Sequence, residues 1–558
     1  MKKTVLGFCL LMFFNAVTAQ HQYTHADTLR GSNGVARSWW DATKYDLHVT
    51  FNLQDSTISG YNVISFKVIK PGSTMQIDLQ EPMLIDSVKF QSSRLNPRGV
   101  RGTEMRSPIL LTNVSNVGNA HFISLNYKLD IYTSGDLFVY YHGKPRIAKR
   151  PPWDGGVIWS KDKQGNPWIS VACQGDGASL WYPCKDYQGD EPDSAELHIT
   201  APSDLVAISN GRMRSTVTNG DGTTTTTWAV INPINNYNLI PYLGKYTHFG
   251  EVYKGLKGNL TMDYWVLDSD LVKAKSQFKE APRMMQAFEY WFGPYPFYED
   301  GYKLVEAPHL GMEHQSAVAY GNKFQNGYRG MDLSGTGVGL KWDFIIVHES
   351  GHEWFGNNIT TVDLADMWVH EGFTNYSESL FTEYWFGKED AQKYEIGIRK
   401  NIENKEPIIP AYGVNAEGPI DMYYKASNMI YTIRQVINND SLFRNILHGL
   451  NKTFYHKTVT SKQVENYISK MSGIDFSKVF DQYLRTIKIP TLAYKVNNGL
   501  LSYRWTNVVA GFKMPVKIYN AHGQLQFIYP TEIVKQMKWS QDSLKVDERF
   551  YILTKQIE

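Results

Sequence analysis

The chain has 558 residues, of which 42% are hydrophobic and 20% are charged, and its formal net charge is +2. A chain of this length is too long to fold around a single hydrophobic core, so we expect two to four domains. The nearly balanced charge excludes the strongly basic surface that nucleic-acid binding needs. With three cysteines, of which Cys9 lies near the start, the chain is no disulfide scaffold. Cys173 and Cys184 are expected either as one bridge or as two buried thiols.

The first nineteen residues have the pattern of a secretory signal peptide. Lys2 and Lys3 precede an apolar run over 5–17, and the small residue Ala19 stands before Gln20. The apolar run is shorter than the ~20 residues that a membrane-spanning helix needs. We therefore predict an exported protein, periplasmic or extracellular, without a stable membrane anchor after removal of residues 1–19.

From residue 20 to about 250, apolar residues mostly alternate with polar ones, as in Leu47, Val49 and Phe51. This period of two predicts a β-rich domain. A hairpin turn is expected at 219–222, because Asn-Gly-Asp-Gly accepts the positive φ of tight turns.

After about residue 276 the spacing of apolar residues becomes helical. Five amphipathic helical segments are expected, at 276–292, 340–356, 367–386, 423–438 and 463–486. Beyond Pro490 the alternation returns in Val516 and Ile518, which predicts a small β domain over 490–558.

The strongest chemical signal is His348-Glu349-Ser350-Gly351-His352, in an apolar segment that suits a buried helix. Four residues make about one helical turn, so both imidazoles project from one face and can bind one ion. Glu349 can reach a metal-bound water without being a ligand. Gly351 would let another element pack closely. Two buried, hydrogen-bonded histidines are the alternative interpretation of these five residues.

Glu371 follows His352 after eighteen residues and completes a set of two imidazoles and one carboxylate. This set leaves a coordination position open for water, as in catalytic zinc sites. His370 competes for the same role, but adjacent helical residues point about 100° apart, so only one of the two can face the ion. Asn375 and Glu378 lie on the face of Glu371, either as an outer shell that orients the ligands or as a polar helix face.

These residues resemble the gluzincin aminopeptidases, the family of aminopeptidase N and leukotriene hydrolase, whose signature is His-Glu-x-x-His, eighteen residues, then Glu. Trp354-Phe355-Gly356-Asn357 is similar to the family's extension of the zinc helix. The resemblance implies a multidomain α+β chain: an N-terminal β-sheet domain over 20–250, a thermolysin-like, helix-rich catalytic domain over 251–489 and the small C-terminal β domain. It also implies one Zn²⁺ per chain, held by His348, His352 and Glu371.

Gly311-Met312-Glu313 resembles the end of the family's exopeptidase motif. The resemblance implies that these residues bind substrate and that Glu313 pairs with the free α-amino group of a peptide. A carboxylate there would restrict cleavage to the first peptide bond, because only that bond has an ammonium group beside it. Leu310 and His314 depart from the family's Gly and Asn, so local hydrogen bonding can differ.

Tyr423-Tyr424-Lys425-Ala426 is similar to the family's Tyr-x-Lys-Gly segment. The resemblance implies that the Tyr423 phenol stabilises the oxyanion, with Tyr424 as its rival. It also implies that Gln174 contacts the substrate backbone; a structural amide at the domain contact is the alternative. Glu349 would act as the general base on a zinc-activated water.

The function expected is zinc-dependent removal of the N-terminal residue from peptides. A thermolysin-like endopeptidase and an inactive peptide-binding protein are the alternatives, while the predicted export argues against a lipid-epoxide hydrolase. Only about seventy residues follow the catalytic segments, so we expect an open cleft or one closed by a homodimer. Gly335-Thr336-Gly337-Val338-Gly339 lacks a following Gly-Lys-Ser/Thr and is interpreted as a loop.

Overall fold

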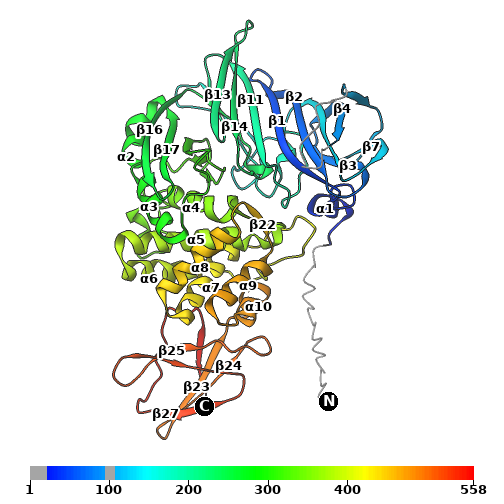
Figure 1. Ribbon diagram of the computed structural model, residues 1–558. Coiled ribbons are helices and arrows are strands. Elements are labelled where there is room, and N and C mark those ends of the chain that lie inside the picture. The colour runs from blue at the N-terminus through cyan, green and yellow to red at the C-terminus, as the bar shows by residue number, and fades with distance from the viewer. Residues whose placement is uncertain (1–21, 95–106, 558) are drawn as a thin grey trace, which may run out of the picture.

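The computed structural model describes residues 22–94 and 107–557. The predicted signal peptide, with Cys9, lies outside the described residues. A β-rich N-terminal part, a helical middle and a small β part at the C-terminal end follow one another in space as in sequence (Figure 1). Among the described residues, no helix combines the length and apolar character that crossing a bilayer requires.

A large twisted sheet of eight strands forms the N-terminal part. Its buried residues Leu47, Val49 and Phe51 alternate with more exposed neighbours along β1, which confirms the predicted period of two. β1 pairs in parallel with β11 and antiparallel with β2. The strand order is β13-β14-β11-β1-β2-β8-β4-β5. The bounds are β1 (Trp40–Asn52), β2 (Thr57–Val68), β4 (Leu84–Arg94), β5 (Ile109–Leu111), β8 (Thr133–Gly143), β11 (Ser194–Pro202), β13 (Arg212–Thr218) and β14 (Thr223–Val230).

The hairpin predicted at 219–222 joins β13 to β14. Asn219 N–H donates to Thr223 O at 2.8 Å, and Gly222 takes a φ of 85°, which only glycine adopts readily. Two smaller sheets and one helix complete this part: β3 (Gly72–Asp78), β7 (Ala120–Leu129) and β6 (Val114–Val117); β12 (Val206–Ile208), β15 (Tyr242–Gly244), β10 (Pro167–Ala172) and β9 (Gly156–Lys161); and α1 (His25–Gly31).

A five-stranded sheet borders the helical middle, in the order β16-β17-β18-β20-β19. Residue 250, the expected domain boundary, lies inside β16, whose partner is β17, and the domain division stays a prediction. The short strands β18 to β20 were not anticipated from the helical spacing. The bounds are β16 (Tyr246–Gly255), β17 (Gly258–Leu267), β18 (Tyr302–Glu306), β19 (Gly311–Met312) and β20 (Val318–Tyr320).

Helix α5 lies at the centre of the helical middle, in contact with α3, α4, α6 and α7. Its residues from Trp368 to Thr382 are all buried, which places the Glu371 segment inside the core. The bounds are α2 (Leu271–Gln277), α3 (Glu280–Phe292), α4 (Phe344–Gly351), α5 (Trp368–Phe386), α6 (Lys388–Gly397), α7 (Asp421–Ile437), α8 (Asp440–Thr453), α9 (Ser461–Ser472) and α10 (Ser477–Arg485), with the strand pair β21 (Ile359–Thr361) and β22 (Lys457–Val459).

Three of the five helical segments differ from expectation. The segment at 276–292 contains the end of α2 and all of α3, with a break at Phe278 and Lys279. The segment at 340–356 is a regular α-helix only over α4, and a π-helix over Glu353–Asn357 follows, in which Phe355 and Gly356 take non-helical angles. The segment at 463–486 is two helices, α9 and α10, rather than one. Gly473 follows α9 with a left-handed φ of 72° and ends it.

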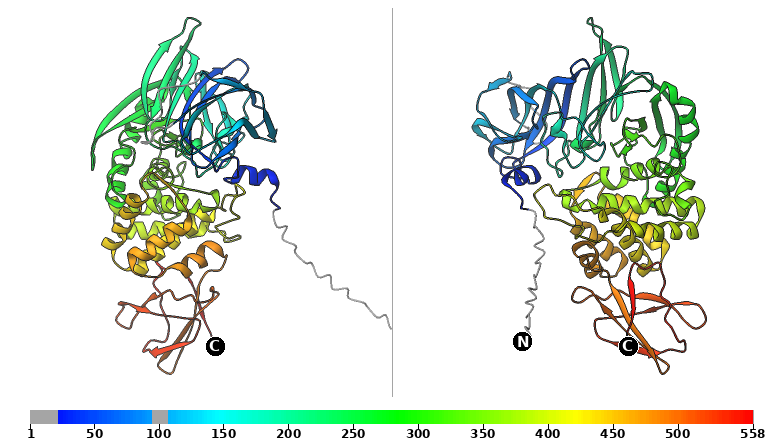
Figure 2. Two further views of the ribbon diagram at one scale, coloured as in Figure 1. Left: turned by 45° about the vertical axis from the view of Figure 1, so that its right-hand side comes forward. Right: turned by 180° about the vertical axis from the view of Figure 1, so that it is seen from behind.

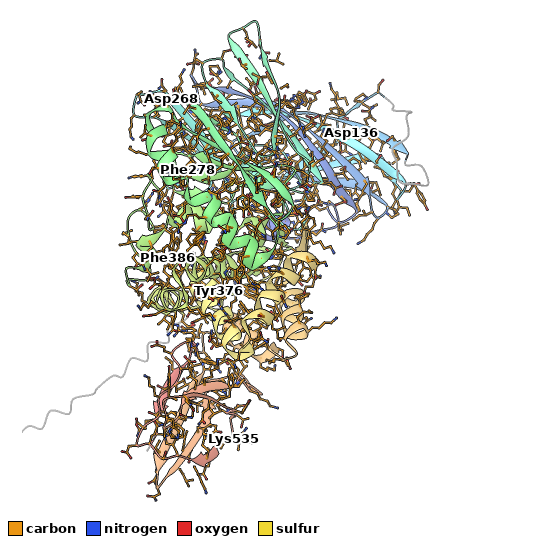
Figure 3. All side chains as sticks on the ribbon, turned by 60° about the vertical axis from the view of Figure 1, so that its left-hand side comes forward. Asp136, Asp268, Phe278, Tyr376, Phe386 and Lys535 are labelled. Atoms are coloured by element: carbon orange, nitrogen blue, oxygen red, sulfur yellow. The ribbon has the colours of Figure 1, made fainter. Side chains whose placement is uncertain are left out.

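The C-terminal part consists of short strands in two sheets, drawn in orange to red in Figures 1 and 2. β25 and β26 pair across a turn at Ala521-His522-Gly523. Figure 3 draws the side chains of all three parts and labels Asp136 in the N-terminal part, Phe278 and Tyr376 in the helical middle and Lys535 in the C-terminal part. The predicted fold class is confirmed. The bounds are β23 (Thr491–Asn497), β24 (Leu500–Thr506), β25 (Val516–Tyr519), β26 (Leu525–Ile528), β27 (Lys535–Lys538) and β28 (Leu553–Gln556).

Candidate active site

Helix α4 presents the two histidines. It begins after Asp343, whose carboxylate accepts hydrogen bonds from the N–H groups of Ile345 and Ile346 and so caps the first turn. His348 lies in the last turn, and His352 is the residue that ends the helix. The helix is shorter than predicted, yet the two imidazoles still stand one turn apart on one side.

Close packing of α5 on α4 brings Glu371 to the histidines. A Cβ atom on Gly351 would lie 2.6 Å from Ser377 Oγ and 3.1 Å from Thr374 Cγ2, so any larger residue would push the helices apart. The interpretation that Gly351 permits close packing is therefore confirmed.

His348, His352 and Glu371 meet in the buried interior between these helices. Glu371 Oε2 lies 3.7 Å from His348 Nε2 and 3.3 Å from His352 Nε2. The three donor atoms all lie within 4.8 Å of one another. Glu371 Oε2 is buried and accepts no hydrogen bond from the described residues, which is costly unless a cation binds there.

The other ring nitrogen of each histidine already has a partner. His348 Nδ1 lies 2.7 Å from Glu378 Oε1, and His352 Nδ1 lies 3.0 Å from the Phe355 carbonyl oxygen. Both partners are acceptors, so Nδ1 donates its hydrogen and the Nε2 lone pair is left to bind a metal. Two such nitrogens and one carboxylate fit a catalytic zinc ion.

Glu378 belongs to the outer shell of this site rather than to a solvated helix face. Its Oε1 also accepts a hydrogen bond from Asn375 Nδ2 at 2.8 Å, and its Oε2 accepts one from Tyr394 OH at 2.6 Å. This network fixes the carboxylate, and the carboxylate fixes the ring of His348.

Removing the Glu378 carboxylate is expected to weaken zinc binding. Loss of such an outer partner typically lowers metal affinity about 10- to 100-fold, and we expect this for Glu378→Ala. Glu378→Gln keeps an oxygen acceptor and should lose less. Zinc affinity would be measured by competition with a chelator of known affinity, and equal affinities in all three proteins would contradict the orienting role.

His370 does not face the ion. Its Nε2 accepts a hydrogen bond from the Thr361 N–H at 2.8 Å, and burial lowers its pKa to about 3, so the ring is neutral. The structure thus places Glu371, and not His370, beside the two histidines.

Glu349 lies against the short strand β19. A Cβ atom on Gly311 would approach Glu349 Oε1 to 2.7 Å, so glycine is required for this contact. Burial raises the pKa of Glu349 to about 7. One oxygen each of Glu313 and Glu349 and one nitrogen of His352 also lie within 4.8 Å of one another. The side chain of Met312 is buried in the core that includes the N-terminal sheets.

Glu313 is held from the N-terminal part of the chain. Its Oε1 accepts hydrogen bonds from Gln174 Nε2 at 2.5 Å and from Tyr237 OH at 2.9 Å. Asn357 Nδ2 donates to the Glu313 carbonyl at 2.8 Å. Gln174 thus contacts Glu313 directly, an arrangement that neither interpretation of Gln174 included. Tyr237 was missed, because no spacing links it to Glu313 in the sequence.

His314, one of the two departures from the family motif, contacts Tyr242 and is not part of the metal cluster. Its Nδ1 lies 2.6 Å from Tyr242 OH, and the ring is fully buried. Burial lowers the pKa of His314 well below its usual range, so the ring is neutral. His314 therefore contacts the N-terminal part of the chain through Tyr242.

Tyr423 stands on the metal side of α7. Its ring stacks on that of His348, with centroids 6.1 Å apart. Burial and the nearby Glu371 carboxylate raise the pKa of Tyr423 well above its usual range, so the phenol keeps its proton. Burial likewise raises the pKa of Tyr424 well above its usual range, but the carboxylate that adds most to this shift is Glu378, the partner of His348 Nδ1.

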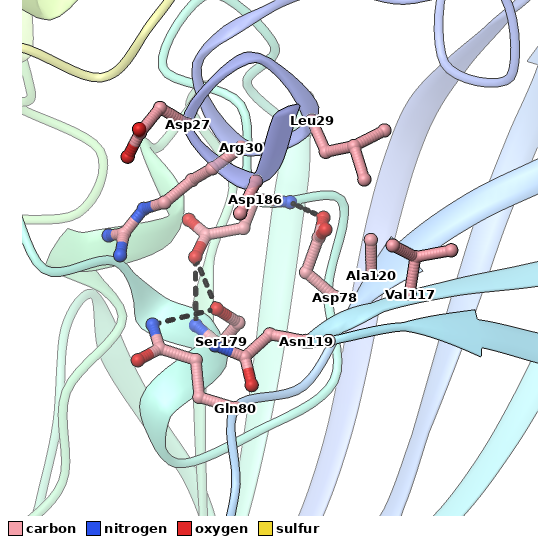
Figure 4. A pocket seen from close by; sticks show the side chains of 12 residues that line it. Asp27, Leu29, Arg30, Asp78, Gln80, Val117, Asn119, Ala120, Ser179 and Asp186 are labelled. Carbon is pink, nitrogen blue, oxygen red and sulfur yellow. Dashed lines mark hydrogen bonds between the residues drawn. The ribbon is translucent and has the colours of Figure 1, made fainter. Parts of the chain in front are cut away.

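The segment of Gln174 is supported from behind by the N-terminal helix. Arg30 Nη2 donates to Gly175 O at 2.9 Å, and Asn415 Nδ2 donates to the same oxygen at 3.0 Å. Beside Arg30, between α1 and the N-terminal strands, lies a cavity of about 300 Å³ that Asp78, Ser179 and other side chains line (Figure 4). It is separate from the metal cluster. Cys173 and Cys184 are both buried and free.

The loop 335–339 is no phosphate cradle. Asp332 accepts hydrogen bonds from the N–H groups of Ser334 and Gly337, which closes the loop on itself. This agrees with the interpretation as a loop.

Two sequence profiles match the chain. The Peptidase M1 N-terminal domain covers residues 41–237, and the Peptidase family M1 domain covers residues 277–483. The chain belongs to peptidase family M1. The second match includes all three residues of the metal cluster and Tyr423, and the first includes Gln174 and Tyr237.

Curated relatives of this M1 peptidase are similar at low identity. Endoplasmic reticulum aminopeptidase 1 of Rattus norvegicus is 22% identical over 514 residues, which cover 85% of this chain and 52% of the relative. Aminopeptidase N of Oryctolagus cuniculus is 23% identical over 501 residues, which cover 79% of this chain and 50% of the relative. The chain spans about half the length of these relatives.

A solved M1 zinc metallopeptidase from Deinococcus radiodurans has the same fold. It superposes with a TM-score of 0.66 at 20% identity and covers 82% of this chain and 96% of its own. A mutant of that protein was solved with a Tyr-Ser-Ala substrate and has a TM-score of 0.65.

Proposed function

We propose that this M1 peptidase is a zinc aminopeptidase that removes the first residue from peptides with a free N-terminus. One observation carries the proposal: a buried carboxylate, Glu313, is fixed by Gln174 and Tyr237 beside the cluster of His348, His352 and Glu371. The family membership and the aminopeptidases among its relatives support the same function.

His348, His352 and Glu371 would hold the ion. When bound, zinc supplies a Lewis acid and an activated water at neutral pH. Glu349, buried beside the cluster, takes a proton from the attacking water and passes it to the leaving amine. The Tyr423 hydroxyl donates a hydrogen bond to the oxyanion that forms on the substrate carbonyl.

Glu313 separates an aminopeptidase from an endopeptidase. A buried carboxylate favours a cationic partner, and a peptide presents an ammonium group one residue from the bond to be cleaved only at its N-terminus. Gln174 and Tyr237 both donate to Glu313 Oε1. Oε2 is the other oxygen of this carboxylate, and we assign the α-ammonium group to it.

The test compares free and N-acetylated peptides, each with and without a zinc chelator. We expect cleavage of the free peptides alone and its loss with chelator. Glu313→Gln removes the charged hydrogen bond to the α-ammonium group of the peptide. We expect this loss to lower kcat/KM about 10- to 100-fold. Cleavage of blocked peptides at internal bonds would indicate a thermolysin-like endopeptidase, and binding without cleavage would indicate an inactive peptide-binding protein.

We also infer that the protein is exported to the periplasm or the extracellular space. The inference rests on the pattern of residues 1–19 alone. Mass spectrometry of the protein from the exported fraction is expected to find Gln20 as its first residue. A homodimer that closes the cleft stays a prediction, to be tested by the mass of the protein in solution.

A further inference from the structure

We propose that Asp46, His48 and His198 form a second metal site on the outer face of the eight-stranded sheet, for zinc or a similar divalent ion. Asp46 and His48 are alternate residues of β1 and therefore share a face. His198 is the direct partner of His48 on the neighbouring parallel strand β11. The two strands lie side by side in the upper part of Figure 1, in the part of the chain that precedes the helical middle.

The three side chains are already close to the spacing that one ion needs. Asp46 Oδ1 lies 3.1 Å from His48 Nε2 and 3.0 Å from His198 Nε2, and the donors all lie within 4.8 Å of one another. Zinc–nitrogen and zinc–oxygen bonds of about 2.0–2.2 Å place tetrahedral donors roughly 3.3–3.5 Å apart. In the catalytic cluster the donor atoms lie 3.3 and 3.7 Å apart. Both clusters therefore deviate from the tetrahedral spacing by at most a few tenths of an ångström.

Two further features match the catalytic cluster. Asp46 Oδ1 is buried and accepts no hydrogen bond of good geometry from the described residues, as is true of Glu371 Oε2. His198 Nδ1 lies 2.9 Å from Thr227 Oγ1, which can accept its hydrogen and leave the Nε2 lone pair for an ion.

In the described part of the chain, the neighbouring charged groups leave Asp46 Oδ1 free of a lysine partner. Lys44 Nζ lies 3.9 Å from Asp46 Oδ2 and 3.3 Å from Glu196 Oε1, so it approaches the outer oxygen of each carboxylate. Glu196 Oε2, the other oxygen, lies 3.6 Å from His198 Nε2 and can serve as a fourth ligand. The side chains of Asp46, His48 and His198 are 20–31% exposed, so an ion can enter from solvent.

One rearrangement accompanies binding. The rings of His48 and His198 stack in parallel, with centroids 3.9 Å apart and 5° between their planes. Parallel lone pairs do not converge on one ion, so one imidazole must tilt out of the stack. His48 is also stacked on Tyr61, with centroids 4.2 Å apart, so the ring that tilts is that of His198. Without a metal, the same residues form an ion triad in which Asp46 pairs with the stacked imidazoles.

The test counts zinc on the full-length protein after chelator treatment and dialysis against zinc at neutral pH. We expect about two ions per chain in the wild type and about one in His198→Phe, which keeps a ring in the stack but removes the donor. Peptidase activity of His198→Phe should equal that of the wild type. His142→Phe is the matched control: His142 pairs with Asp86 at 2.6 Å on the same sheet but has no second imidazole, so it should keep both ions.

Glu371→Gln separates this proposal from the proposed function. It should lose the catalytic ion and keep the sheet ion. One zinc ion per chain in both the wild type and His198→Phe would overturn the sheet site and establish the ion triad, whatever the peptidase assay shows. Circular dichroism of each zinc-free variant checks that its fold is retained.

Discussion

Replacing Glu349 by glutamine is expected to lower kcat by about 100- to 10,000-fold, the usual contribution of a positioned general base. Glutamine has the size of glutamate but cannot take a proton from water at neutral pH. Glu349 lies beside the metal cluster and is not one of its three converging ligands, so the variant should retain its zinc. Steady-state kinetics on a free aminoacyl substrate and the zinc content of the same preparation measure both effects.

Glu389→Gln is the control for this prediction. Glu389 lies on the exposed surface of α6, where it pairs with Lys393, and its loss should leave kcat unchanged. A Glu349→Gln protein with kcat within a few-fold of the wild type would show that another group moves the proton. A protein that lost its zinc would show that Glu349 is a ligand.

Tyr423→Phe is expected to lower kcat about 100- to 1000-fold with little change in KM, because the phenol stabilises charge that develops only in the transition state. The ring of Tyr423 stacks on His348, and phenylalanine preserves that contact. The variant therefore removes the hydroxyl alone, and kcat and KM measured separately report its role.

Tyr424→Phe provides the matched comparison, since Tyr424 is the next residue on the same helix. The carboxylate with the largest effect on its pKa is Glu378, which binds His348 Nδ1 rather than the metal side of the ring, so we expect at most a small loss. If Tyr424→Phe lost more kcat than Tyr423→Phe, the hydrogen bond to the oxyanion would be assigned to Tyr424.

Local patterns predicted the features that depend on local geometry. Alternation of Leu47, Val49 and Phe51 predicted strand β1, and Asn-Gly-Asp-Gly predicted the hairpin between β13 and β14. The spacing of His348 and His352 predicted two imidazoles on one side of a helix, since one turn fixes their directions wherever the helix lies.

Features that depend on tertiary contacts were predicted less well. The π-helical turn after α4, with non-helical angles at Phe355 and Gly356, lies in the buried core, where the packing of residues distant in sequence sets the backbone. Gln174 and Tyr237 reach Glu313 across 139 and 76 residues of sequence, and no local pattern encodes such a contact. The strands β18 to β20 are short and fully buried, so they lack the alternation that marks a strand with one exposed face.

The most direct test of the account is anomalous diffraction at the zinc edge from crystals of the purified protein. We expect a peak within bonding distance of His348 Nε2, His352 Nε2 and a Glu371 carboxylate oxygen, with Glu349 close by but unbonded. A map from zinc-containing protein without a peak among these three side chains would contradict the account.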